Sequence, residues 1–293
     1  MPTTVSVNGR ITGGDAAVIS VFDHGFLYGE GIYEMLRTYG GQPFLFDRHM
    51  RRMRQSAAMM HLPVPFTDDE LARDIARTAE QAALAPGEAY IRVLVTRGVG
   101  ELTYDLRATP TPSVVIIVGP LREPPATAYA DGVGVVIVDV VRNHPATVDP
   151  MIKSNNLLNL ALAQQEAFRR GAFEGVMRNY HGELVECSTA NLFVVRDGAT
   201  LTPPIAAGLL PGITREFVLE IGPAAGVRME EAALRDADLF GADEALLTST
   251  TREIVPIVRV DDRPIADGTP GPVTRRLLEE FRRRARVPQA TTG

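Results

Sequence analysis

The stretch DPMIKSNNLLNLALAQQEA, residues 149–167, contains the only lysine of the chain, Lys153. The other 29 of the 30 lysine and arginine residues are arginine. A guanidinium stays protonated and cannot act as an amine nucleophile. A lysine amine can, and it forms Schiff bases with carbonyl compounds. Because Lys153 lies between an irregular segment and an expected apolar helix, we interpret it as a reactive amine. A composition bias that left one lysine is the alternative, and the surrounding motifs must decide.

The chain of 293 residues, 45% hydrophobic, is long enough for two domains with their own cores. Helical and strand patterns mix without the strict alternation of a doubly wound sheet, so we predict an α+β fold. We place an N-terminal, substrate-facing domain at 1–118, a proline-containing linker at 119–131 and a second domain at 132–293. The expected elements are helices at 48–60, 68–83, 157–170, 214–221 and 273–285, strand pairs at 3–8 with 16–21 and within 175–195, a hairpin at 36–46, and strands at 89–96, 114–118, 133–141 and 244–248.

Composition excludes several classes of protein. A net charge of −6 and a pI near 5.5 disfavour a nucleic-acid binder, which would be basic. The single cysteine, Cys187, excludes an intrachain disulfide framework and is typical of a reducing compartment. The N-terminal segment lacks the pattern of a secretory signal, and no apolar run is long enough for a membrane span. Histidine and cysteine spacings indicate no metal site. We therefore expect a cytoplasmic globular protein.

Glu186 lies in LVECSTANLF, residues 184–193, where one expected strand ends and the next begins. A carboxylate buried there needs a cationic partner, and a protonated pyridine nitrogen is one such partner. A solvated glutamate at a strand edge is the alternative explanation of this residue.

Two further segments have the chemistry of anion-binding turns. Gly212 precedes Ile213 and Thr214 at an expected helix start, where free N–H groups and the helix dipole favour a phosphate. Ser249, Thr250 and Thr251 directly follow an apolar strand and offer hydroxyl and N–H donors. Each segment alone is compatible with ordinary capping or turn formation. Together with one amine and one carboxylate, they indicate a pyridoxal phosphate site.

Four motifs resemble, in order and spacing, those of the class IV aminotransferases, which are fold type IV pyridoxal phosphate enzymes. The resemblance spans about residues 5 to 285. It implies a two-domain α+β protein with a small N-terminal α/β sandwich domain and a larger, β-barrel-like C-terminal domain with helices. The motifs are DPMIKSNNLLNLALAQQEA (149–167), GELVECSTANLFVV (182–195), LLPGITREFVLE (209–220) and LLTSTTREIVPI (246–257).

The resemblance assigns roles to the residues of these motifs. Lys153 is implied to bind pyridoxal 5'-phosphate covalently and to transfer the proton between the substrate α-carbon and the cofactor. Glu186 is implied to bond the pyridine nitrogen and keep it protonated. Ile213, Thr214 and Thr250 are implied to hold the phosphate.

The same family places an arginine three residues after a histidine in an earlier helix. The segment LFDRHMRRMRQSA, residues 45–57, matches this pattern, and the match assigns Arg52 to the phosphate as a charge-assisted donor. Family members are homodimers in which each active site is completed by the partner subunit, so the resemblance also implies a homodimer here.

The substrate-facing segments resemble those of branched-chain aminotransferases. In YGEGIYEMLRTYGG, residues 28–41, Tyr28 and Tyr33 are implied to line the pocket with Arg37 nearby. In AYIRVLVTRGVGEL, residues 89–102, Tyr90 and Arg92 match the contacts to the substrate carboxylate and to the glutamate side chain.

Other residues conflict over which member of the family this is. D-amino acid aminotransferases carry an Arg-x-His pair after TRG, and this chain has Leu102 and Tyr104 there. Branched-chain enzymes carry a tyrosine just after the lysine, and this chain has Leu157, as the D-amino acid enzymes do. The segments ECS (186–188) and TSTT (248–251) also resemble the D-amino acid enzymes more closely. Thr250 and Thr251 are assigned to substrate contacts as well.

Because specificity is set by differential contacts with substrates, we give the substrate-facing motifs more weight. The sequence then predicts a transaminase that moves an amino group between a hydrophobic, branched-chain L-amino acid and 2-oxoglutarate. A D-amino acid transaminase is the nearest alternative. More distant ones are an (R)-amine transaminase, an aminodeoxychorismate lyase and a non-catalytic dimeric binding protein.

Overall fold

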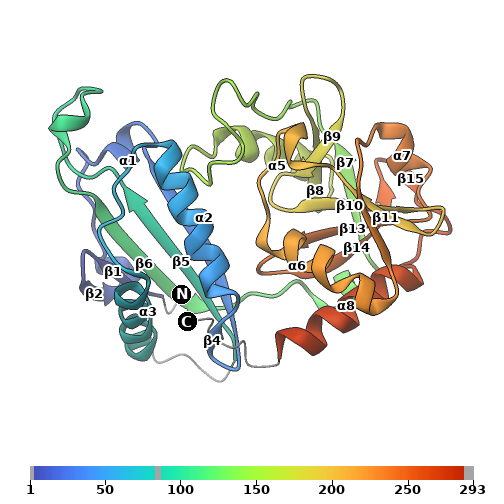
Figure 1. Ribbon diagram of the computed structural model, residues 1–293, viewed down its shortest axis with the longest axis horizontal. Coiled ribbons are helices and arrows are strands. Elements are labelled where there is room, and N and C mark those ends of the chain that lie inside the picture. The colour runs from blue at the N-terminus through green and yellow to red at the C-terminus, as the bar shows by residue number, and fades with distance from the viewer. Residues whose placement is uncertain (1–2, 83–86, 287–293) are drawn as a thin grey trace. The chain divides into compact units, whose positions relative to one another are not determined.

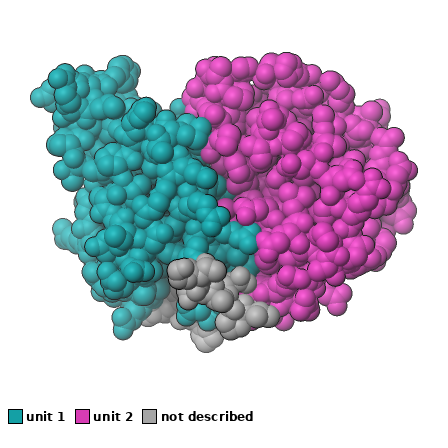
Figure 2. Space-filling view, viewed as in Figure 1, with its two compact units in different colours: residues 1–122, 152–156, 289–293 teal, residues 123–151, 157–288 magenta. Residues whose placement is uncertain are grey.

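The computed structural model describes residues 3–82 and 87–286, which form two compact units (Figure 2). Unit 1 contains the described residues up to Arg122 together with Ile152–Asn156. Unit 2 contains Glu123–Met151 and the described residues from Leu157 onward. The domain bounds drawn from the sequence stay a prediction, and the last residue of the helix predicted at 68–83 lies outside the described residues. The segment with Lys153 belongs to unit 1, although the chain on both sides of it belongs to unit 2.

Unit 1 is built on one antiparallel sheet of six strands in the order β2-β1-β6-β5-β3-β4. Helices α2 (Phe46–Met59) and α3 (Asp68–Ala82) lie against one face of this sheet (Figure 1). A short helix, α1 (His24–Leu27), precedes β3. The strands are β1 (Thr4–Val7), β2 (Arg10–Gly13), β3 (Gly31–Tyr39), β4 (Gln42–Pro43), β5 (Ala89–Thr96) and β6 (Ser113–Pro120).

Local sequence explains how these helices start and which faces they bury. The Thr67 hydroxyl accepts from the Glu70 N–H at 3.2 Å, and the Glu70 carboxylate accepts from the Thr67 N–H at 2.7 Å. This reciprocal capping box begins α3. Leu71 and Ile75 of α3 are buried in the same core as Met50 of α2, as the helical period requires.

The prediction of a strand at 16–21 is wrong. β1 instead pairs with β2, and Val7 lies opposite Arg10. The two residues between them, Asn8 and Gly9, both have positive φ, 49° and 83°. An Asn-Gly pair of this kind forms the tight turn that matches strand twist, so it closes the hairpin before the chain reaches residue 16.

Unit 2 contains a closed barrel of six strands, β10-β13-β14-β7-β8-β9, in which β9 pairs again with β10. β11 and β12 extend the sheet from β10, and β15 pairs with β14. The strands are β7 (Val133–Ile137), β8 (Glu174–Arg178), β9 (Leu184–Cys187), β10 (Asn191–Arg196), β11 (Ala199–Thr202), β12 (Arg228–Glu231), β13 (Glu244–Ser249), β14 (Glu253–Val260) and β15 (Arg263–Pro264).

Helices pack around this barrel, and the predicted α+β class is confirmed. α5 approaches β8 so closely at Gly175 that a Cβ there would lie 3.0 Å from the carbonyl oxygen of Ala163. Within residues 3–82 and 87–286, no helix is both long and apolar enough to cross a membrane. The helices of unit 2 are α4 (Ala126–Ala130), α5 (Leu158–Arg169), α6 (Ile213–Ile221), α7 (Asp236–Phe240) and α8 (Pro272–Ala285).

Candidate active site

Lys153 is held against β3 by backbone hydrogen bonds. The Tyr33 N–H donates to the Lys153 carbonyl at 2.9 Å, and the Asn155 N–H donates to the Gly31 carbonyl at 2.8 Å. The Lys153 N–H in turn donates to Ser56 Oγ on α2 at 3.1 Å. The irregular segment expected around this residue is thus fixed like a short strand, and the Lys153 amine has a defined position.

The Lys153 amine and the Arg92 guanidinium both contact the ring of Tyr33. Lys153 Nζ lies 4.3 Å from the centroid of the Tyr33 ring, and the guanidinium carbon of Arg92 lies 4.2 Å from the same centroid. Both distances are within the range of cation–π attraction. The structure therefore brings together three of the residues singled out from the sequence: an amine, a buried aromatic surface and a permanent cation.

The other substrate candidates of β3 and β5 lie on the same face of the sheet. Ile32 and Ile91 point into the core beneath α2. Because successive side chains of a strand alternate between faces, Tyr33, Arg37 and Tyr90 point to the opposite face. The Arg37 guanidinium packs at 4.2 Å from the Tyr39 ring centroid.

Tyr28 lies at the C-terminal end of α1 and contacts a different set of rings. Its ring centroid is 4.9 Å from that of His24 and 5.1 Å from that of Tyr104. Tyr104 and Leu102 are largely exposed, at 79% and 67%. The structure thus joins Tyr28 to the loop that follows β5.

Arg52 is buried on the α2 side of the sheet and pairs with a carboxylate that the sequence did not single out. Its Nε and Nη2 donate to Glu34 Oε1 and Oε2 at 2.8 and 2.7 Å. His49 Nδ1 lies 2.7 Å from Glu34 Oε2. The signal for this trio is present in the sequence, because α2 places His49 and Arg52 one turn apart and β3 turns Glu34 toward them.

Charges in this trio are strongly coupled. Burial alone raises the pKa of Glu34, but the Arg52 and His49 charges and hydrogen bonds outweigh it and hold that pKa far below its usual range. Burial lowers the pKa of His49, and the charges of Arg52 and Lys153 act in the same direction against the opposing effect of Glu34. At neutral pH the trio therefore holds an ionised glutamate, an arginine and a neutral imidazole.

Glu186, on β9 of unit 2, is buried and takes hydrogen bonds from three directions. Arg142 Nε donates to its Oε1 at 2.7 Å. Asn191 Nδ2 and the Leu210 N–H donate to its Oε2 at 3.3 and 3.2 Å. These donors stabilise the carboxylate form. Arg142 was missed because it is distant in sequence and lies in no recognisable motif.

The start of α6 is tied to Glu186 through Asn191, which also donates to the Leu210 carbonyl at 3.1 Å. A Cβ on Gly212 would overlap Asn191 Oδ1, so this position requires glycine. Gly212 is the N-cap and provides no side-chain cap, which leaves the first-turn N–H groups of Ile213 and Thr214 available to a ligand. This is the chemistry of a helix N-terminal anion site.

Thr250 and Thr251 are half-buried in the turn between β13 and β14. Glu186 lies opposite Asn191 on the next strand, and Asn191 lies opposite Thr248 on the strand after that. The turn that begins just after Thr248 therefore lies at the same end of the barrel as Glu186. Thr248 Oγ1 is buried and lacks a hydrogen-bond partner among the described residues. An unpaired hydroxyl beside two hydroxyl-bearing residues adds to the donors available at this end of the barrel.

Comparison with known proteins identifies the family. A family model described as "Amino-transferase class IV" matches residues 31–260. The chain belongs to the class IV aminotransferases. These are pyridoxal phosphate-dependent enzymes, and the predicted family, fold type, enzyme class and cofactor are confirmed.

The relatives of this aminotransferase include both substrate types considered above. It is 36% identical over 278 residues to the protein named "Putative branched-chain-amino-acid aminotransferase" of Methanocaldococcus jannaschii, covering 95% of each chain. It is 31% identical over 280 residues to the D-alanine aminotransferase of Listeria monocytogenes, covering 94% of each chain. The branched-chain aminotransferase of Thermoproteus uzoniensis, solved with norvaline, matches with a TM-score of 0.88 and 32% identity, covering 96% of this chain and 94% of that chain.

The described residues fit the chemical demands of pyridoxal phosphate. The cofactor needs an amine for its carbonyl, and Lys153 is the only ε-amine. It needs a carboxylate for its pyridine nitrogen, and Glu186 is buried and already held in its ionised form by Arg142. It needs donors for its phosphate, and the uncapped start of α6 provides them.

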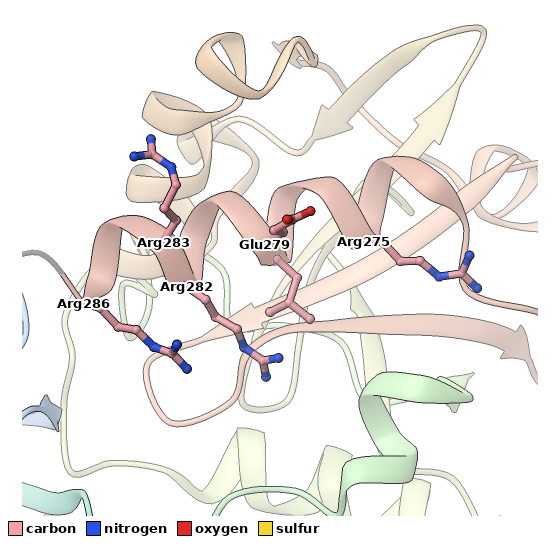
Figure 3. A pocket seen from close by; sticks show the side chains of 6 residues that line it. Arg275, Glu279, Arg282, Arg283 and Arg286 are labelled. Carbon is pink, nitrogen blue, oxygen red and sulfur yellow. The ribbon is translucent and has the colours of Figure 1, made fainter.

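A cavity of about 470 Å³ is lined by residues of α8 and its C-terminal cap. These residues follow all of the predicted site residues in the sequence. Figure 3 shows Arg282 and Arg286 pointing to one side of the helix and Arg283 to the other. Arg282 and Arg283 donate to Glu253 and Glu280. The described residues that line it all belong to α8 or to its C-terminal cap, and none of them was predicted to bind cofactor or substrate. Its lining is Arg275, Leu278, Glu279, Arg282, Arg283 and Arg286.

The lowered pKa of Glu34 predicts an acid-dependent contribution to stability. A group whose pKa is lower in the folded than in the unfolded state stabilises the fold above its unfolded pKa, here near 4.5, and this contribution is lost as the pH falls toward the folded pKa. We expect Glu34→Gln to be strongly destabilising at pH 7, and the difference from the wild type to shrink below pH 4.5 by up to about 1.4 kcal/mol per pH unit.

Urea unfolding of both proteins between pH 3 and 7 measures this difference. Glu80→Gln, an exposed change on α3, is the matched control and should show a small, nearly pH-independent difference. A Glu34→Gln difference that stays constant from pH 7 to pH 3 would contradict the assignment.

Proposed function

We propose that this aminotransferase moves an amino group between a hydrophobic, branched-chain L-amino acid and 2-oxoglutarate. The observation that carries the proposal is the position of Arg92 and Tyr33 beside the Lys153 amine. An aromatic surface suits the apolar side chain, and a guanidinium suits the second carboxylate of glutamate. Two chemically different side chains can then be accepted in turn at one place.

Lys153 is assigned two tasks in this reaction. It holds the cofactor covalently in the resting enzyme, and its freed amine moves a proton to and from the substrate α-carbon. Bound pyridoxal phosphate supplies the electron sink that makes this carbon acidic. Tyr33 and Ser56 keep the amine in place through the backbone contacts described above.

Glu186 is assigned to the pyridine nitrogen, which it keeps protonated. The Arg142 hydrogen bond supports this role, because it favours the carboxylate form, whose negative charge stabilises a protonated pyridine nitrogen. Ile213, Thr214 and Thr250 are proposed to hold the phosphate. Arg52 is proposed to add positive charge to the same group, with its orientation set by Glu34.

The remaining substrate contacts are proposals of the same kind. Tyr90 and Arg37 share the sheet face of Arg92, which supports contacts to the substrate carboxylate and side chain. Tyr28 is proposed to line the apolar side of the pocket. Thr250 and Thr251 are proposed to contact substrate as well as cofactor.

The D-amino acid transaminase is a second candidate function. The identity to the Listeria enzyme and the presence of Leu157 after the lysine support it. Leu102 and Tyr104 disfavour it, because neither side chain binds a carboxylate as an arginine and a histidine would.

We also propose that the enzyme is a cytoplasmic homodimer. Unit 1 exposes large apolar side chains at two segments, 18–26 and 99–106, including Phe26 at 67% and Leu102 at 67%. Contiguous exposed apolar surface of this kind marks association sites. A second copy of the chain is the partner that the resemblance implies.

The amino donor and its handedness test the proposed function directly. With 2-oxoglutarate as acceptor, L-leucine should yield L-glutamate, and D-alanine should give a kcat/KM at least about 100-fold lower, because the wrong enantiomer cannot place its α-hydrogen and its carboxylate together. Chiral chromatography of the glutamate formed reads out both outcomes. Preferential formation of D-glutamate from D-alanine would instead establish the second candidate.

Borohydride treatment of the cofactor-bound enzyme should fix the cofactor on Lys153. Mass spectrometry of the digested protein should find one modified side chain, since no other ε-amine exists. Lys153→Ala should lose both the visible absorption of the bound cofactor and transamination, and Lys153→Arg should behave the same way despite its retained charge. Label on any other residue, or activity in Lys153→Arg, would exclude this role.

Arg92→Ala should separate the two substrates. Loss of a charge-assisted contact to the glutamate side chain is expected to lower kcat/KM for glutamate by about 10- to 100-fold. The value for L-leucine should change by less than about threefold, because leucine makes no such contact. Arg92→Lys, which keeps the charge, should recover part of the glutamate value. Equal losses for both substrates would count against the shared pocket.

A further inference from the structure

Glu174, the first residue of β8, is a buried carboxylate with no role in the reaction described so far. Its Oε2 accepts from Ser188 Oγ at 2.5 Å and from the Thr189 N–H at 3.1 Å. The Thr189 hydroxyl donates to its Oε1. Glu174 therefore gathers the donors of the turn that connects β9, the strand of Glu186, to β10.

Arg252 bonds Glu174 from the other side. Its Nη1 donates to Glu174 Oε1 at 2.6 Å. Its Nη2 donates to the Thr189 carbonyl at 3.0 Å and to Thr189 Oγ1 at 2.7 Å, and its Nε donates to Ser249 Oγ at 3.0 Å. The Arg252 carbonyl accepts from the Tyr129 hydroxyl at 3.2 Å. Both the side chain and the backbone of this residue are fixed.

All three guanidinium nitrogens of Arg252 donate to protein groups, Nη1 to Glu174, Nη2 to Thr189 and Nε to Ser249, and through them the side chain links two turns. One is the Ser188–Thr189 turn, two residues beyond Glu186. The other is the turn that contains Thr250 and Thr251. An arginine that donates to this many protein groups holds its neighbours in fixed positions.

We propose that the Glu174–Arg252 pair is a positioning device that holds the Thr250–Thr251 turn at a fixed place relative to Glu186. This rests on the proposed function, in which Glu186 takes the pyridine nitrogen and Thr250 the phosphate. Pyridoxal phosphate is rigid, so the residues that bind its pyridine nitrogen and its phosphate must lie a fixed distance apart. The Glu174–Arg252 pair joins the turn after Glu186 to the turn that contains Thr250.

Strand pairing holds the strands in place, and side-chain hydrogen bonds hold the turn. The register Glu186–Asn191–Thr248 fixes the strands up to the last pair of β13. The pair Ser249–Glu253 is the last of the β13–β14 ladder, and Thr250, Thr251 and Arg252 form the turn beyond it. The Arg252 side chain ties this turn to Glu174 and Thr189. Loss of the tie is expected to let the turn shift, and a misplacement of about 1 Å can cost about 100-fold where geometry matters.

Pyridoxal phosphate and pyridoxal, which lacks the phosphate, test this device. Both offer the same carbonyl to Lys153 and the same ring to Glu186, so the ratio of their dissociation constants isolates the phosphate contacts. Absorbance titration of the cofactor-free protein gives both constants. In Arg252→Lys and in Glu174→Gln, we expect the ratio of the pyridoxal value to the pyridoxal phosphate value to fall about tenfold or more, with the pyridoxal constant nearly unchanged.

Arg282→Lys is the matched control. Arg282 donates at 2.6 Å to Glu253, the residue that follows Arg252. It donates to neither of the two turns. Its ratio should equal that of the wild type. If Arg252→Lys or Glu174→Gln weakens both ligands equally, the pair serves general stability and the positioning role is overturned.

A milder variant covers the case in which these proteins do not fold. Ser249→Ala removes only the Arg252 Nε contact, and it should lower the ratio by about threefold. An unchanged ratio in Ser249→Ala would likewise overturn the proposal. A wild type that binds neither ligand would contradict the proposed function itself, whereas a phosphate preference retained in every variant would contradict only the positioning role.

Discussion

The barrel closes where Asn191 of β10 lies opposite Glu186 of β9, and the carboxylate proposed to bind the pyridine nitrogen belongs to the same pair. The Asn191 amide donates to the Glu186 carboxylate and to the Leu210 carbonyl, so it joins two strands to the loop before α6. Gly212 is required because its backbone approaches Asn191 so closely. The pair that completes the sheet therefore also positions the carboxylate relative to the start of α6.

Arginine is the partner of several buried carboxylates of this enzyme, Glu34, Glu174 and Glu186 among them. Breaking such a pair leaves a charge without a partner, which is strongly destabilising, and the planar guanidinium can bond a carboxylate and its surroundings at once. The buried pairs are Arg52 with Glu34, Arg142 with Glu186, and Arg252 with Glu174.

Sequence predicted the main helices because they follow from local period, and the family because of motif order and spacing, and the barrel was implied by the resemblance to that family. It predicted Lys153 and Glu186 because their chemical type is rare or costly at such places. It did not predict Arg142, whose partner is 44 residues away, since pairing across that distance is decided by tertiary packing. The strand placed at 16–21 failed for a local reason, the tight turn at Asn8.

The path of the chain makes the two units interdependent. Residues 152–156 leave unit 2, add to the sheet of unit 1 beside Tyr33, and return. A contiguous piece ending at Arg122 would thus lack both the backbone partner of β3 and the reactive amine, and a piece beginning at Glu123 would have the amine without the residues that hold it. Neither unit can therefore be transferred whole as one contiguous segment by gene fusion or fragment exchange.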